Sequence, residues 1–372
     1  MSRGGGLALA AVFVAALAVL FANVWRHHVY TPDGLAYARY ALRDAGRNDR
    51  QATLEARAFY EKTPLMNEGA RYRDLVEIAP SVAFARSQIF QSRVLYPALA
   101  AIFIRFDGLN SLFLVSAIAY AGFGLALYWL LLAMGRTWSA LILTVLVLLL
   151  PSTRAAAASD LTDMLALAFW TAWLACLMYS MMRGRSLEGL AILAASSTLL
   201  VLTRPAPYLV ILPAIVAAIL RGMWPELLAT CVCLVAYAID AITMHAFGIR
   251  EQLQWIYGHL PSGARVSFSQ WYRSALADTV KSSIAFIFRA TYPIVGLACA
   301  VYLLIRRTAR DEVLVLLAAF VACFIVLPVN PVTNQVARVA GLPLLPIAAA
   351  LIQAACSLLP DRLPNQRRAP AM

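Results

Sequence analysis

Long apolar stretches, separated by short polar ones, dominate the chain. A helix needs about 17 to 25 residues to cross the apolar core of a bilayer. Stretches near that length lie at 7–25, 109–134, 138–157, 161–182, 188–203, 205–221, 226–248, 284–305, 312–329 and 336–358. The pattern predicts an all-α polytopic membrane protein with about ten transmembrane helices. A single transmembrane domain is expected at 1–358, with a basic, disordered cytoplasmic tail at 359–372.

The first apolar stretch allows two interpretations. Met-Ser-Arg precedes an apolar core, as in a secretory signal peptide, but the nineteen residues of 7–25 exceed the usual length of such a core. A retained first helix is therefore favoured over a cleaved signal.

Two long segments separate the predicted helices, at 26–92 and 249–283. In the first, apolar positions recur at helical spacing, as in Leu35, Ala38 and Leu42 and again in Leu54 and Ala58. This spacing predicts short amphipathic helices on the membrane surface rather than a separate domain. Residues 93–106 are apolar but too short to span, so an interfacial or re-entrant helix is expected there.

Composition supports a lipid-solvated protein. Hydrophobic residues make up 62% of the chain and charged ones 13%, which leaves too few polar side chains to cover a water-soluble globule. The net charge of +12 would suggest nucleic-acid binding in a soluble protein. Here basic loops and anionic headgroups account for it, so no nucleic-acid partner is expected. The six cysteines all fall within apolar stretches and predict no disulfide or zinc site.

The distribution of basic residues predicts the orientation, because short cytoplasmic loops are rich in Arg and Lys. With the amino terminus inside, the cytoplasmic side receives Arg3, Arg136, Arg183, Arg185, Arg221, Arg306, Arg307, Arg310, Arg362, Arg367 and Arg368. The short outer turns keep only Arg154, Arg204 and Arg338. Both termini are therefore predicted to be cytoplasmic, with 26–92 and 249–283 as extracytoplasmic loops.

Carboxylates gather at the outer helix ends. Asp33 follows the first helix, where it can bind substrate or simply face a helix amino terminus, with Thr31 as the N-cap. Asp160 and Asp163 stand three residues apart at the start of the fourth helix, which predicts that they share one face. They can interact with the helix end, bind a divalent cation or hold a hydroxyl group.

Two arginines also lie at outer helix ends. Arg204 follows the helix at 188–203 and Arg338 lies near the start of the last one. Each can reach a lipid phosphate at the membrane surface or hold a substrate phosphate with its planar guanidinium group. The sequence leaves both interpretations open.

Five short motifs occur in order along the chain. They are Pro32-Asp33-Gly34-Leu35-Ala36-Tyr37-Ala38, Arg93-Val94-Leu95-Tyr96-Pro97, Thr162-Asp163-Met164-Leu165-Ala166-Leu167-Ala168-Phe169, Thr203-Arg204-Pro205 with Pro213, and Arg338 followed by Leu342-Pro343-Leu344-Leu345-Pro346. Over roughly residues 7–350 this order resembles the GT-C superfamily. These are membrane glycosyltransferases that use polyprenyl-phosphate sugars, among them aminoarabinose transferase and protein O-mannosyltransferase.

The resemblance implies a GT-C-like fold in a bacterial inner membrane, with an extracytoplasmic active face. Asp33 is then the base of an inverting sugar transfer to a cell-envelope glycan, lipid or protein. Residues that bind the donor phosphate or the substrate would be Arg93, Tyr96, Asp160, Asp163, Arg204 and Arg338. Many relatives carry a second acid where this chain has Gly34. That difference leaves open whether a divalent cation takes part.

Other functions fit the same pattern less closely. A transporter or flippase would carry charged residues near the middle of its helices, where Asp240 is the main example. A polysaccharide polymerase or ligase would use basic residues of the second long loop, such as Arg250, His259, Arg265 and Arg273. A scaffold without catalysis would need Asp33 only for stability.

Overall fold

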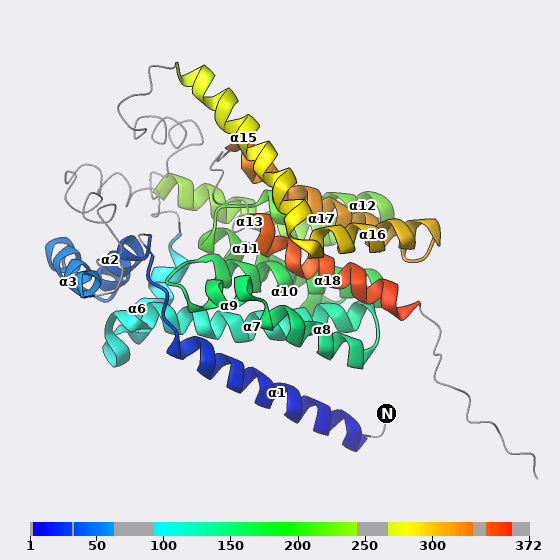
Figure 1. Cartoon of the computed structure of the whole chain (residues 1–372), viewed down its shortest axis with the longest axis horizontal. Helices are drawn as coiled ribbons and strands as arrows, with labels where there is room; N and C mark the ends of the chain where they lie inside the picture. Colours follow the sequence, from blue (N-terminus) through cyan, green and yellow to red (C-terminus); the bar gives the residue numbers. More distant parts are fainter. Residues whose placement is uncertain (1–2, 32, 63–92, 244–266, 330–339, 359–372) are drawn as a thin grey trace, which may run out of the picture.

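The computed structural model describes residues 3–31, 33–62, 93–243, 267–329 and 340–358, and these are organised almost entirely as helices (Figure 1). Among them the only extended pairing is an isolated bridge between Val29 and Ser159. The helices are α1 (Arg3–Arg26), α2 (Gly34–Asp44), α3 (Asp49–Glu61), α6 (Leu95–Asp107), α7 (Ser111–Met134), α8 (Thr137–Leu149), α9 (Pro151–Ala158), α10 (Asp163–Arg183), α11 (Leu187–Thr203), α12 (Tyr208–Arg221), α13 (Trp224–Thr243), α15 (Phe268–Arg289), α16 (Thr291–Ile305), α17 (Arg310–Val329) and α18 (Leu342–Ser357). The predicted all-α class is confirmed.

Fewer helices than expected are long and apolar enough to cross a membrane. Three stretches within the described residues meet both conditions, namely Leu95–Met134, Asp163–Arg183 and Trp224–Thr243. Two bent helix pairs raise the number to five if each pair is one span. The apolar helices Phe13–Arg26, α11, α12 and α18 are shorter. The described part of the chain therefore has three to five candidate spans.

A proline lies at one bend and close to the other. α8 and α9 meet at 62° where Leu150, with ψ of 135°, precedes Pro151. A residue before proline is pushed out of the helical region, and proline is tolerated at the first helical position. α15 and α16 meet at 78°, and Pro293 lies in the first turn of α16. The predicted spans 138–157 and 284–305 are thus each divided between two helices.

The last part of the segment expected as the second long loop is helical. α15 begins at Phe268, where Ser267 and Gln270 form a reciprocal capping box. Residues 268–283 therefore belong to a helix and not to the expected loop at 249–283. Residues 249–266 lie outside the described part of the chain.

α7 and α10 form the centre of the bundle. α7 packs against α10, α1, α6, α8 and α18, and α10 packs against α11 as well. The large side chains Trp170 and Trp173 of α10 are fully buried and stack on one another. α11 and α12 have different main neighbours, since α11 packs on α13 and α12 on α17. α11 and α12 are joined by a short connection at Arg204 and Pro205, yet they pack mainly against other helices and not against each other.

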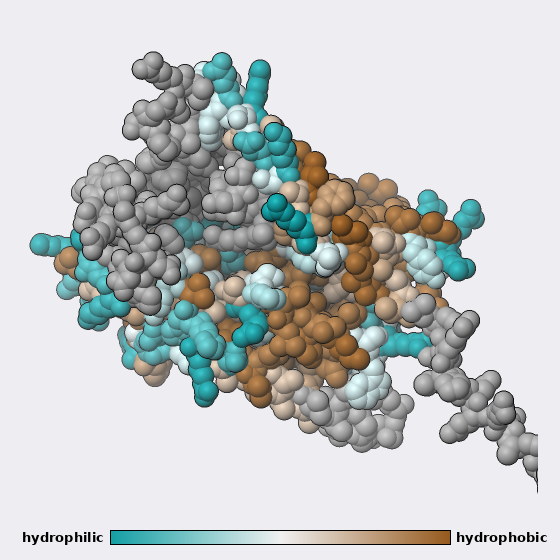
Figure 2. Space-filling view, in the orientation of Figure 1, coloured by the Kyte–Doolittle hydropathy of each residue, from teal (hydrophilic) through white to brown (hydrophobic). Residues whose placement is uncertain are grey.

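Polar and apolar residues separate along the molecule. On the face shown in Figure 2, apolar side chains gather across the middle and hydrophilic ones toward the ends of the long axis. At one end of α10, Arg185 makes a two-point ion pair with the buried Glu226 at 2.9 and 3.2 Å. At its other end, Asp163 pairs with Arg204. This arrangement fits a bundle with an apolar belt between two polar ends.

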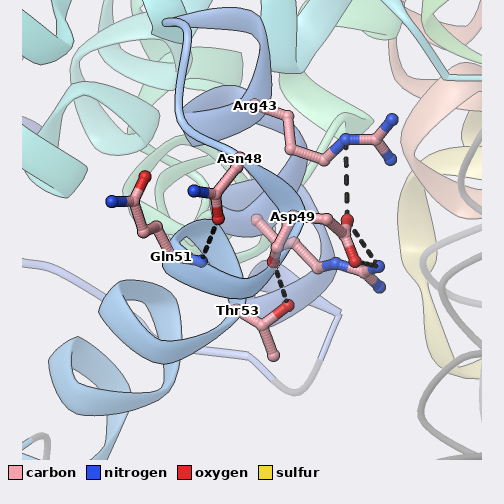
Figure 3. A network of polar contacts seen from close by, with 6 residues as sticks. Arg43, Asn48, Asp49, Gln51 and Thr53 are labelled. Carbon is pink, nitrogen blue, oxygen red and sulfur yellow. Dashed lines mark hydrogen bonds and ion pairs between the residues drawn. The ribbon is translucent and has the colours of Figure 1, made fainter.

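α2 and α3 pack on one another beside α6, and polar contacts fix the corner between them. Asn48 caps α3 by accepting a hydrogen bond from the Gln51 amide at 2.9 Å (Figure 3). Asp49 pairs with Arg39 at 2.8 Å and with Arg43 at 3.6 Å. The prediction of short helices after α1 is confirmed for this part of 26–92, and residues 63–92 lie outside the described chain.

α3 packs against the protein through a different face from the one that carries Leu54 and Ala58. Ala52, Ala56 and Tyr60 are buried, whereas Ala58 is exposed and Leu54 is 58% exposed. Alanines and a tyrosine at a spacing of four residues form the packed face, since positions four apart lie on one side of a helix. In α2 the expected positions Ala38 and Leu42 are buried.

α16 and α18 approach so closely that Gly296 has no room for a side chain. A Cβ atom there would lie 3.0 Å from the Ala348 backbone. Gly296→Val should therefore lower the free energy of unfolding by about 1–3 kcal/mol, the usual cost of overpacking. The control is Gly122→Val in α7, where a Cβ atom meets nothing within 4 Å. Thermal unfolding in detergent should separate the two variants, and equal stability would contradict the close approach.

Candidate functional site

The Asp160 carboxylate lies in the turn between α9 and α10, and its residue is completely buried. Oδ1 accepts a hydrogen bond from the Thr31 hydroxyl at 2.6 Å, and Oδ2 accepts one from the Thr31 amide at 3.2 Å. The Tyr60 hydroxyl of α3 also donates to Oδ2. Burial raises the pKa of Asp160 to about 6, although these donors favour the charged form and oppose the shift.

Gly34 is the first residue of α2, and it lies directly against this carboxylate. A Cβ atom at position 34 would overlap both the Asp160 carboxylate and the Tyr60 hydroxyl. The backbone amide of Gly34 donates to Thr31 Oγ1 at 3.2 Å. Packing therefore explains why this position, where the expected motif has a second acid, carries no side chain.

Asp33 immediately precedes α2. It lies between Thr31, which is hydrogen-bonded to Asp160, and Gly34, which packs against Asp160. Its backbone is helical, with φ of −70° and ψ of −30°, and its side chain makes no capping hydrogen bond. The backbone carbonyl of Asp33 accepts from the amides of Ala36 and Tyr37. Thr31 acts near the helix end as predicted, but α2 begins at Gly34 and not at residue 32. The carboxylate of Asp33 is thus not used to cap the helix.

Tyr37 connects Asp33 to Arg93. The Tyr37 hydroxyl is fully buried and accepts a hydrogen bond from Arg93 Nη1 at 2.6 Å. It also feels the charge of Asp33 and lies beside the Thr162 side chain. Burial raises the pKa of Tyr37, so the neutral phenol is the stable form. Arg93 is therefore held close to the first turn of α2. This contact joins the motif at 93–97 to the motif at 32–38.

Tyr96 is buried and makes contacts with α2 and α7. Its ring meets that of Tyr37 edge to face at 5.4 Å between centroids. Its hydroxyl donates to the Leu112 carbonyl of α7 at 2.8 Å and lies 3.0 Å from Ser116 Oγ. The residue is 0% exposed. Tyr96 therefore joins α6 to α7, and its hydroxyl group is engaged by α7.

Asp163 and Arg204 form a second group. Their ion pair measures 2.9 Å, and the two side chains are 3% and 16% exposed. They line a pocket of about 20 Å³ together with apolar residues of α10, α11, α12 and α18. That volume is enough for about one water molecule. The pairing favours a buried polar role for Arg204 over contact with lipid headgroups alone.

The expectation that Asp160 and Asp163 share a helix face is wrong. α10 begins at Asp163, so helical spacing does not extend back to Asp160. Asp160 turns toward Thr31 and Tyr60, whereas Asp163 turns toward Arg204. Among the described residues, the structure thus brings the predicted site residues to the same end of α10 as two adjacent groups. Arg338 lies outside the described residues.

Tyr60 is the site residue that sequence reasoning missed. It lies 27 positions after Asp33 and contacts Asp160 from the side of α3 that does not carry Leu54 and Ala58. The series Ala52, Ala56 and Tyr60, at intervals of four residues, is the signal that indicates its burial.

Within the described ranges no group of three or more His, Cys, Asp or Glu side chains is arranged to hold a metal ion. No protein-family model matches the chain, and no curated protein shows significant similarity to it.

The raised pKa of Asp160 predicts how stability depends on pH. The native state binds the proton more tightly than the unfolded state, whose carboxyl has its ordinary value near 3.8. This stabilising contribution is complete below about pH 3.8 and is lost as the pH rises through about 6. The Tm of the wild type minus the Tm of Asp160→Asn should therefore be larger at about pH 4.5 than at about pH 7.5. Parallel pH profiles for the two proteins would contradict this.

Proposed function

We propose that the protein is a membrane glycosyltransferase that transfers a sugar from a polyprenyl-phosphate donor to an extracytoplasmic acceptor. The acceptor would be a cell-envelope glycan, lipid or protein. One observation carries the proposal. Asp33, Arg93, Asp163 and Arg204, which come from four separate motifs, lie together with Asp160 around one end of α10.

The reaction needs few protein groups. The acceptor hydroxyl attacks the anomeric carbon, the new C–O bond forms as the bond to the phosphate breaks, and the sugar inverts. A base takes the hydroxyl proton, and cations stabilise the departing phosphate. Asp33 is the proposed base, because it is the acidic residue of the first motif and lies at the start of α2, where its charge acts on the Tyr37 hydroxyl that binds Arg93.

Arg93 and Arg204 are the proposed phosphate ligands, with Arg338 as a third. Arg93 is held by Tyr37 next to Asp33. Arg204 is partly exposed while paired with Asp163. A guanidinium group has five N–H donors, so one ion pair is compatible with a second anionic partner. Asp160 would hold the surrounding backbone, and Asp163 would hold substrate hydroxyl groups.

We propose a bacterial inner-membrane location, about ten spans and cytoplasmic termini. The few candidate spans support membrane association, and the finer topology rests on the distribution of arginines. Ion pairs such as Arg185 with Glu226 and Arg221 with Asp311 would then lie on the cytoplasmic side. The polar group around Asp33 would face the opposite compartment, where a lipid-linked donor presents its headgroup.

Transport of a lipid-linked or small substrate is the second candidate. It is favoured by Asp240, an acidic residue that is 5% exposed within the candidate span α13. A buried carboxylate inside a span is costly and often marks a substrate or ion path. If the protein is a transporter, Asp240→Asn should abolish transport. If it is a glycosyltransferase, the same substitution should leave sugar transfer unchanged.

The direct test is Asp33→Asn, measured by transfer of labelled sugar from a panel of polyprenyl-phosphate donors to membrane acceptors. Loss of the base should lower transfer by about 10²- to 10⁴-fold at matched membrane abundance. Asp44→Asn is the control, because Asp44 is an exposed acid at the other end of α2. Unchanged transfer by Asp33→Asn would remove this residue from the role of base, and no transfer by the wild type with any donor would overturn the proposed function.

A further inference from the structure

We infer that Asp160 is a positioning residue that fixes the Asp33 carboxylate through hydrogen bonds to Thr31 and contact with Gly34. The inference rests on the proposed function and deepens it. Asp160 itself is completely buried and accepts three hydrogen bonds from the protein, so it is not placed to touch a substrate.

The first step is the hold on Thr31. Asp160 accepts from both the amide and the hydroxyl of Thr31, at 3.2 and 2.6 Å, which fixes the backbone and the rotamer of that residue together. The same Thr31 oxygen accepts the Gly34 amide at 3.2 Å. Thr31 is therefore bound directly to the Asp160 carboxylate, and Gly34, on the other side of Asp33, is bound to it through Thr31.

The second step is the contact at Gly34. Its Cα lies so close to the Asp160 carboxylate and the Tyr60 hydroxyl that no Cβ atom fits. Tyr60 completes the enclosure from α3 by donating to the same Oδ2 atom. The turn carrying Asp33 thus rests on a surface formed by α3 and by the residues just before α10.

The third step is the rigidity of that surface. Asp160 lies three residues before Asp163, which begins the most buried candidate span in the described chain. The neighbouring Ala158 carbonyl accepts the Val29 amide at 2.8 Å, which adds a backbone contact to the segment after α1. Displacements of about 1 Å at a catalytic group can cost about 100-fold in rate, so this support would matter for kcat.

The test compares two substitutions of Thr31. Thr31→Val keeps the shape of the side chain and removes the hydroxyl, whereas Thr31→Ser keeps the hydroxyl. With the sugar-transfer assay, Thr31→Val and Asp160→Asn should lower kcat by about 10- to 100-fold, with the KM for the donor changed by less than about 2-fold. Thr31→Ser should stay near the wild-type rate. Wild-type kcat in a folded Thr31→Val, or an effect on KM alone, would overturn the positioning role.

A second measurement needs no enzymatic activity and separates this inference from the proposed function. Asp33→Cys introduces a thiol at the site, and its modification rate by a membrane-impermeant maleimide is measured after subtracting the reaction of the parent chain. Adding Thr31→Val should change that rate by about 10-fold as the turn loosens, and adding Thr31→Ser should not. Equal rates in all three backgrounds would overturn the inference even if the wild type transfers sugar. A wild type without transfer, but with the predicted rate difference, would overturn only the proposed function.

Discussion

The Asp160 carboxylate is buried where the segment after α1, the end of α3 and the turn before α10 meet, and a carboxylate in such a place must be hydrogen-bonded. Leaving a buried acceptor without donors costs far more than a single hydrogen bond contributes when it is made. Thr31 and Tyr60 supply the donors, from positions 129 and 100 residues away in the chain. The surroundings of Asp33 depend on this one requirement, including the absence of a side chain at Gly34 and the start of α2.

The membrane imposes the second constraint, because charged groups are costly in the apolar core and collect at helix ends. α10 has 21 residues and carries Asp163 at its first position and Arg183 at its last. The ion pair at its amino end joins α10 to the residue after α11, and the pair between Arg185 and Glu226 joins the loop after α10 to α13. The polar groups therefore lie at the two ends of α10, and the candidate site is at its amino end.

Local sequence predicted much of the helical architecture. Apolar length located most of the helices, and Thr31 acts at a helix start because its side chain accepts a nearby amide. The bends at Pro151 and Pro293 were present in the sequence as proline positions. A count of apolar residues misses them, since hydropathy averages ignore backbone restriction. In the described residues three to five candidate spans pass by length and composition, because two apolar stretches are bent and several apolar helices are short.

The site was less accessible to prediction, since it depends on contacts between distant segments. Helical spacing suggested one face for Asp160 and Asp163, but the helix starts only at the second of them. The partner of Asp160 on α3 could not be chosen without knowing which face of that helix packs inward. Leu54 is the more hydrophobic residue, yet the alanines and Tyr60 make the contact. Small size along the contact, which lets helices approach, outweighs hydrophobicity there.

The most direct test of the Asp160 contact is a double-mutant cycle of unfolding free energies with Asp160→Asn, Tyr60→Phe and the combined variant, measured in detergent at neutral pH. A hydrogen bond to a buried charged group predicts a coupling energy of about 1–3 kcal/mol between the two positions. Effects that add to within about 0.5 kcal/mol would show that the two side chains do not interact and would contradict the account of how the Asp33 turn is held.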